Sequence, residues 1–329
     1  MNPEQQERSE REQAARVLPP APHPEPAPGL VRARRQHLLD EIARQPRVPA
    51  LRPGRRVALV LGAAAVAATA VGALGLGPWG SPAPRAAPPA SAASVRLLER
   101  AALTAAAEPL PKVRAGQYAY VKVIGRTTVL SEGASGEMER LREDQGMEQW
   151  TSVDGGDRTL QRKGGRDQLL PAAPGKGDLN SPTHTFLAAL PTDPDALLKR
   201  IYEDAEKNHG SGSGSTTGPD QQAFVTIGDL LRTSAAPPAT TAALYRAAAR
   251  IPGVVVVPDV VDAAGRRGVA VARVHDGERT EWIFDRSTVR LLGARTVLLE
   301  DNAWGKAGTA VTSVAVMSSG IVDEAGQVP

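Results

Sequence analysis

The longest apolar stretch of the chain runs from residue 57 to residue 77 and holds 21 residues without a charge. A helix of that length rises about 30 Å, which matches the hydrocarbon thickness of a bilayer. Its N-terminal side is crowded by arginines, including Arg47, Arg52, Arg55 and Arg56. The far side carries no charge until Arg85. Because basic flanks stay in the cytoplasm, the pattern predicts one transmembrane helix with the N-terminus inside the cell.

Two other structures can produce an apolar stretch. A cleaved signal peptide has a short N-terminal region and an apolar run of about 7–15 residues, whereas 56 residues precede this run. A buried helix of a soluble protein carries polar residues on one face, and Thr69 is the only candidate. An uncleaved signal anchor in the cell membrane is therefore predicted. Small residues four apart (Ala64, Ala68 and Gly72) would let two such helices meet, but the oligomeric state stays open.

The segments on either side of this helix are polar and Pro-rich. Residues 1–29 lack the apolar content of a core and are expected to be disordered. Apolar residues at helical spacing predict a short amphipathic helix at 31–45. The chain is therefore divided into a cytoplasmic tail at 1–56, the transmembrane helix at 57–77, a Pro/Ala/Ser linker at 78–92 and an extracytoplasmic domain at 93–325.

Within that domain the apolar pattern changes period several times. It predicts a helix at 93–107, a strand pair or a long bent strand at 116–130, and strands within 147–163. Pro194 suits the first turn of a helix, and two more helices are expected around Phe224–Leu231 and Leu244–Ile251. Strands return after Val254. This order predicts an α+β fold, with a curved antiparallel sheet and helices on one face.

Composition and charge narrow the classes of function. The chain has no cysteine, which excludes thiol nucleophiles, disulfides and thiolate metal sites. Residues 1–56 carry 11 arginines and 7 acidic residues, and residues 57–329 carry 28 basic and 29 acidic residues. The net charges are +4 and −1, so the large domain has no basic footprint for a phosphate backbone. Nucleic acid is not a predicted partner.

Motifs for catalysis or metal binding are not apparent. The five histidines are scattered without metal-ligand spacing, and His184 and His275 are predicted to be surface residues. Gly75-x-Gly77-x-x-Gly80 matches a dinucleotide fingerprint but follows no strand and opens no helix. The prediction is a non-enzymatic chain with no catalytic residue, metal or cofactor.

A short segment near the C-terminus supplies the only candidate site. Trp282 and Phe284 alternate along a predicted strand and therefore share one face. They are interpreted first as core residues and second as the lining of a ligand groove. Asp285, which follows them, is typical of a turn start, where its carboxylate accepts backbone N–H bonds.

Several stretches resemble an uncharacterised family of actinobacterial single-pass membrane proteins, namely Arg35–Ile42, Gly116–Val123, Leu190–Tyr202 and Leu244–Val297. The last stretch has a strand ending in Asp-x-x-Thr and then a Leu-Leu strand, and it is similar to a wider group, the LolA/RseB-type half-barrels. The resemblance implies a curved sheet wrapped over helices, used to hold lipid chains or to sense envelope proteins. It carries over no catalytic residue.

These observations predict a membrane-anchored binding or sensory module of the cell envelope. Its expected ligand is a lipid or an envelope protein. Two alternatives remain: a regulator that docks a cytoplasmic partner of the sigma-factor type through its tail, and an envelope enzyme with an unrecognised site.

Overall fold

The computed structural model describes residues 87–110, 112–133, 137–173, 176–209 and 218–329. All of these residues lie in the second of the two units into which the chain divides, residues 80–329. The predicted tail, transmembrane helix and four flanking arginines (Arg47, Arg52, Arg55 and Arg56) lie outside them, as does most of the linker. None of the helices within the described ranges is both long and apolar enough to cross a membrane.

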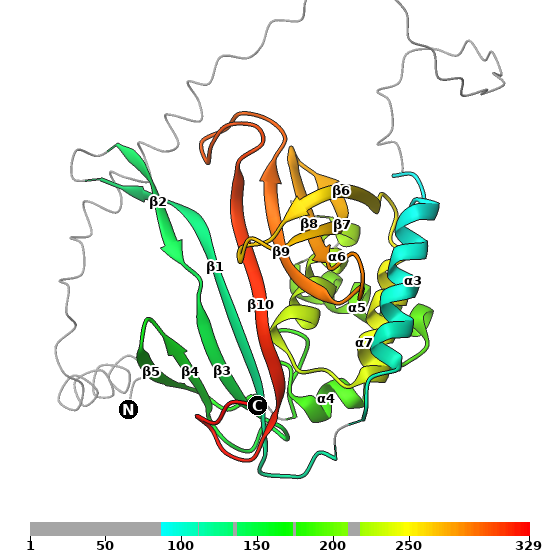
Figure 1. The fold of residues 1–329 in the computed structure, drawn as a ribbon, viewed down its shortest axis with the longest axis vertical. Helices are drawn as coiled ribbons and strands as arrows, with labels where there is room; N and C mark the ends of the chain where they lie inside the picture. The colour runs from blue at the N-terminus through cyan, green and yellow to red at the C-terminus, as the bar shows by residue number, and fades with distance from the viewer. Residues whose placement is uncertain (1–86, 111, 134–136, 174–175, 210–217) are drawn as a thin grey trace, which may run out of the picture. The chain divides into compact units, whose positions relative to one another are not determined.

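An open antiparallel sheet of ten strands forms the framework of the described residues (Figure 1). Its strands are β1 (Tyr118–Glu132), β2 (Met138–Asp144), β3 (Met147–Ser152), β4 (Thr159–Lys163), β5 (Arg166–Leu170), β6 (Val255–Val261), β7 (Arg267–His275), β8 (Glu278–Phe284), β9 (Leu291–Leu298) and β10 (Ala310–Val322). They follow the order β5-β4-β3-β1-β10-β9-β8-β7-β6, with β2 also paired to β1. The first and last strands of this order do not pair within the described residues, so the sheet is curved but not closed.

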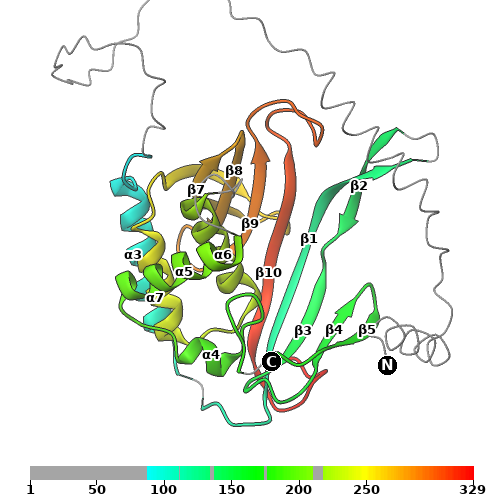
Figure 2. The same cartoon turned by 180° about the vertical axis from the view of Figure 1, so that it is seen from behind.

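The helices of the described residues are α3 (Ala92–Ala106), α4 (His184–Ala188), α5 (Pro194–His209), α6 (Pro219–Thr233) and α7 (Pro238–Ala248). Helices α3 and α6 contact the β6–β9 part of the sheet, and α6 lies in front of it when seen from behind (Figure 2). Helices α5, α6 and α7 each begin at a proline, whose fixed φ suits a first turn. The Ser91 side chain caps α3 by accepting a hydrogen bond from the Ser94 N–H. The predicted α+β class and antiparallel sheet with helices are confirmed.

The main hydrophobic core lies between the helices and β7–β9. The Trp282 ring stacks on Phe224 with centroids 4.0 Å apart, and Phe284 lies 5.7 Å from Tyr245. Gly228 permits the first contact, because a Cβ there would come within 2.4 Å of the indole nitrogen of Trp282. The aromatic pairs therefore join β8 to α6 and α7.

Along one edge, strand β1 pairs with two strands in succession. Residues Tyr118–Val123 pair with β3, and Arg126–Glu132 pair with β2. Strands β2 and β3 run in the same direction, separated only by Gln145 and Gly146. The predicted strand pair or bent strand at 116–130 is thus one long strand, with an irregular register against β10 after Lys122.

Candidate functional site

One row of side chains crosses five strands on the face away from the helices. Directly opposed residues in this row, from β8 to β2, are Glu281, Arg295, Ser313, Arg126 and Asp144. The neighbouring Trp282 points into the helix-facing core, and successive residues of a strand point to opposite faces. The row therefore brings charged residues from distant parts of the sequence onto the helix-free face.

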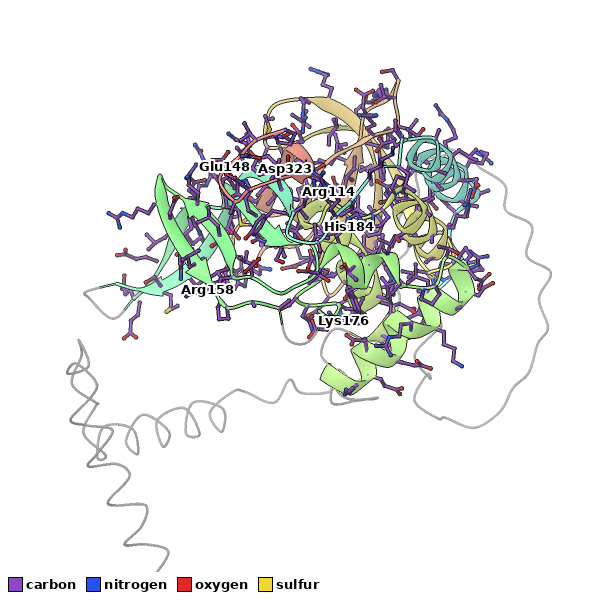
Figure 3. All side chains as sticks on the ribbon, turned by 90° about the horizontal axis from the view of Figure 1, so that it is seen from below. Arg114, Glu148, Arg158, Lys176, His184 and Asp323 are labelled. Atoms are coloured by element: carbon purple, nitrogen blue, oxygen red, sulfur yellow. The ribbon has the colours of Figure 1, made fainter. Side chains whose placement is uncertain are left out.

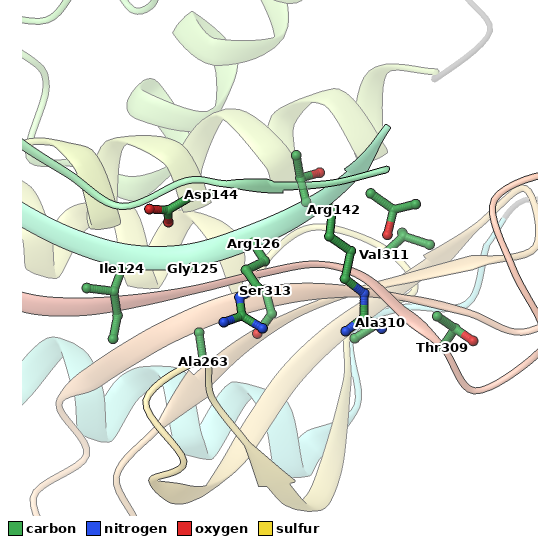
Figure 4. A pocket seen from close by; sticks show the side chains of 12 residues that line it. Ile124, Gly125, Arg126, Arg142, Asp144, Ala263, Thr309, Ala310, Val311 and Ser313 are labelled. Atoms are coloured by element: carbon green, nitrogen blue, oxygen red, sulfur yellow. The ribbon is translucent and has the colours of Figure 1, made fainter. Parts of the chain in front are cut away.

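A groove of about 720 Å³ lies at the β1–β2 end of this row (Figure 4). We call it the arginine groove. Its walls come from β1 (Ile124–Thr128), β2 (Arg142 and Asp144), the β6–β7 turn (Ala263), the start of β10 (Ala310, Val311 and Ser313) and Thr309, which precedes β10. Figure 4 shows the Arg126 and Arg142 side chains reaching toward Ser313 and Ala310.

The wall opposite the arginines depends on the β6–β7 turn. The Asp262 carboxylate is buried and accepts a 2.7 Å hydrogen bond from Arg266 Nε. Arg266 also donates to the carbonyl oxygens of Leu292 at 2.7 Å and Val316 at 3.0 Å. These bonds fix the turn across β9 and β10, and they place Ala263 beside the groove.

The two guanidinium groups of the groove are available to a ligand. Among the described residues neither Arg126 nor Arg142 has a hydrogen-bond or ion-pair partner. Asp144, which faces Arg126 across the strand pair, accepts instead from the Gly146 N–H at 2.8 Å. Arg140, on the same strand, donates to the Ala303 carbonyl at 2.7 Å and does not line the groove. The groove therefore presents two free cations beside one carboxylate.

At the β8 end of the row, Glu281 forms a buried ion-pair cluster with two arginines. The Glu281 side chain is fully buried and accepts 2.7 Å bonds from Arg279 Nε and Arg295 Nε. Arg295 also donates to the Val261 carbonyl. Because both carboxylate oxygens are occupied and shielded from water, Glu281 anchors the sheet and does not act as an accessible acid.

A second cavity, of about 570 Å³, lies on another part of the sheet. Its lining comes from β3, β4, the end of β5, the segments that follow β5 and the last residue of α6, and it includes Met147, Gln149, Leu170 and Thr233. No charged side chain is among these lining residues. This cavity offers apolar and neutral polar contacts, in contrast to the arginine groove.

The candidates predicted from sequence are placed as follows. Trp282 and Phe284 are 2% and 0% exposed and belong to the core, in line with the packing interpretation, and they do not line either cavity. Asp285 acts at its turn as expected, because its Oδ1 accepts from the Ser287 and Thr288 N–H groups. His184, which is labelled in Figure 3, was predicted at the surface, but it is buried, and its Nδ1 lies 2.9 Å from the Ala235 carbonyl oxygen.

The groove was not predicted from the sequence. Arg126 and Arg142 are 16 residues apart and lie in segments whose charges resemble an ordinary solvated surface. Only the antiparallel register of β1 and β2 places them on one face.

A tyrosine–glutamate pair lies further along the same face of β1. The Tyr120 hydroxyl donates to Glu148 Oε1 at 2.8 Å. Burial and this bond raise the pKa of Tyr120 to about 12. The bond from Tyr120, with nearby Lys122, holds the pKa of the Glu148 carboxyl below its usual value. The pair links β1 to β3.

We expect Tyr120→Phe to raise the pKa of Glu148 toward its ordinary value of 4.5. A carboxyl with a lowered folded pKa adds stability above its unfolded pKa, and loses that contribution as the pH falls through the folded value. The variant should therefore lose less stability than the parent chain below pH 4.5. Carboxyl-carbon NMR titration measures the shift directly, and an unchanged Glu148 pKa in the variant would contradict the assignment.

Comparisons with known proteins find only distant structural likeness. A structure of the Pseudomonas aeruginosa MucA/MucB complex matches with a TM-score of 0.24 and 13% identity, over 72% of this chain and 59% of that one. A crystal structure of MucB matches with a TM-score of 0.23 and 14% identity, over 73% and 62%. In both cases the match spans less than two thirds of the matched chain. No family model and no curated protein matches the sequence.

Proposed function

We propose that the chain is a membrane-anchored, extracytoplasmic binding module of the cell envelope, and that the arginine groove takes its ligand. One observation supports the second part of this proposal. The Arg126 and Arg142 guanidinium groups have no partner within the part of the chain that the structure describes, and they face a groove of about 720 Å³. Pockets of roughly 300–1,000 Å³ with a few convergent polar groups are typical of ligand sites. The ligand is expected to carry negative charge.

The chemistry of the lining favours binding over catalysis. Ser313, Thr128 and Thr309 supply hydroxyl groups, but no histidine lines the groove to activate them. The one lining carboxylate, Asp144, is exposed and bonded to backbone. General acid–base work by paired carboxylates needs a second such group. These features support a non-enzymatic role.

The predicted topology has a direct test because the chain has no native cysteine. Single variants Ser9→Cys, in the tail, and Ala307→Cys, at an exposed position after β9, can be treated on intact cells with a membrane-impermeant maleimide. We expect labelling of Ala307→Cys alone, and labelling of Ser9→Cys only after permeabilisation. The reverse pattern, or recovery of the chain in the aqueous fraction, contradicts an anchored chain with its tail inside.

The ligand itself can be sought by mass spectrometry of molecules retained by the full chain after purification from its native cells in mild detergent. An Arg126→Gln/Arg142→Gln double variant removes both free guanidinium groups. Arg140→Gln is the matched control, because it changes the same charge outside the groove. We expect a species kept by the parent and by the control and lost from the double variant. Identical retention by all three chains would contradict a role for the groove.

A further inference from the structure

We propose that the arginine groove binds an extended peptide segment with acidic side chains at alternate positions. This inference rests on the proposed function and adds the class and the spacing of the ligand. It follows from the register of β1 and β2, from the dimensions of the groove and from its charge.

Spacing is the first argument. Arg126 lies opposite Asp144, and Arg142 lies two residues earlier on β2, opposite Thr128. Arg126 and Arg142 are therefore diagonal neighbours on one face, about 7–8 Å apart at the backbone. In an extended peptide, residues two apart point to the same side and are separated by about 7 Å. Acids at positions i and i+2 can then each meet one guanidinium, whereas adjacent acids point to opposite sides.

Shape is the second argument. The groove follows five consecutive residues of β1, Ile124–Thr128, which is about 13 Å of strand. Its small side chains, Ala263, Ala310 and Ser313, leave room for a backbone to approach. The Ser313 and Thr128 hydroxyls offer hydrogen bonds to peptide groups. A volume of about 720 Å³ fits several residues, and far exceeds the needs of a single small anion.

Charge is the third argument. A guanidinium binds a carboxylate with two parallel N–H···O bonds, and this fixes both position and orientation. Asp144, on the β3 side of the groove, disfavours a further acid there and so limits where the two acids can lie. Alternate acids therefore match the two arginines in number and in spacing.

The test uses the full chain in nanodiscs of neutral phosphatidylcholine and two fluorescein-labelled peptides of identical composition. The first, Gly-Glu-Ser-Glu-Ser-Gly, has alternate acids, and the second, Gly-Glu-Glu-Ser-Ser-Gly, has adjacent acids. Fluorescence anisotropy should show at least about tenfold tighter binding of the first peptide. Arg126→Gln and Arg142→Gln should each weaken that binding about tenfold, and Arg140→Gln should leave it unchanged.

If the two peptides bind with equal affinity, the proposed spacing of the acidic side chains is wrong. If Arg140→Gln weakens binding of the first peptide as much as Arg126→Gln and Arg142→Gln do, the arginine groove is not the binding site. Inorganic pyrophosphate serves as a third probe. If pyrophosphate binds in an Arg126- and Arg142-dependent way and neither peptide binds, this inference fails, while the groove remains an anion site and the proposed function stands. If none of the three probes binds and co-purification also yields no groove-dependent species, the proposed function fails as well.

Discussion

Trp282→Ala is expected to lower the free energy of unfolding by about 3–5 kcal/mol, the range measured for large aromatic residues removed from a core. The ring is 2% exposed, stacks on Phe224 at 4.0 Å and fills the space left by Gly228. Truncation removes these contacts and leaves a cavity between β8 and α6. The neighbouring backbone can collapse only in part, because β8 is paired on both sides.

The matched control is Trp304→Ala, since Trp304 is 40% exposed in the segment between β9 and β10. A change at such a position usually stays within about 0.5 kcal/mol. Denaturant unfolding followed by far-ultraviolet circular dichroism compares the two variants without relying on tryptophan emission. Equal unfolding midpoints for the two variants would remove Trp282 from the core and restore the groove-lining interpretation of its side chain.

Glu281→Gln is expected to lower the free energy of unfolding by about 3 kcal/mol, because breaking a buried ion pair leaves a buried charge without a partner. The amide keeps the shape of the carboxylate but loses its charge and one acceptor, so Arg279 on β8 and Arg295 on β9 are left without a neutralising anion between them. Their side chains are 26% and 21% exposed, and water screens part of this cost. The expected value therefore lies at the lower end of the range for buried pairs.

Glu143→Gln makes the same chemical change on the exposed strand β2, and its effect should stay within about 0.5 kcal/mol. Unfolding of both variants at low and at high salt separates the two cases, since a buried pair is screened much less than a surface charge. If Glu281→Gln were as stable as Glu143→Gln, the cluster would not hold β8 to β9.

The elements with a strong apolar period were predictable from the sequence. The helix expected at 93–107 is α3, Ala92–Ala106, and the helix expected after the second proline of the Pro-Thr-Asp-Pro segment begins at Pro194. Each buries an apolar stripe against the sheet or a neighbouring helix, and that burial produces the periodicity. The strands after Val254 were likewise marked by alternation.

Two strands and the groove were not predictable. Strand β2 (Met138–Asp144) is exposed at every position, so no buried face imposes an alternation on its sequence. Within the described ranges, strand β5 (Arg166–Leu170) pairs only with β4, and it is also largely exposed. Both exist because a neighbouring strand supplies hydrogen-bond partners, and that information lies elsewhere in the chain. The burial of His184 likewise depends on Ala235, which is 51 residues away.

The composite construction of the arginine groove offers a practical route to its ligand. Its walls come from β1, β2, the β6–β7 turn and β10, so they meet only when the sheet is assembled. A molecule that binds there has no counterpart site on the unfolded chain, and at a hundred times its dissociation constant it should add about 2.7 kcal/mol to the stability. Raised melting temperatures in a library screen would then report groove occupancy before any ligand is known.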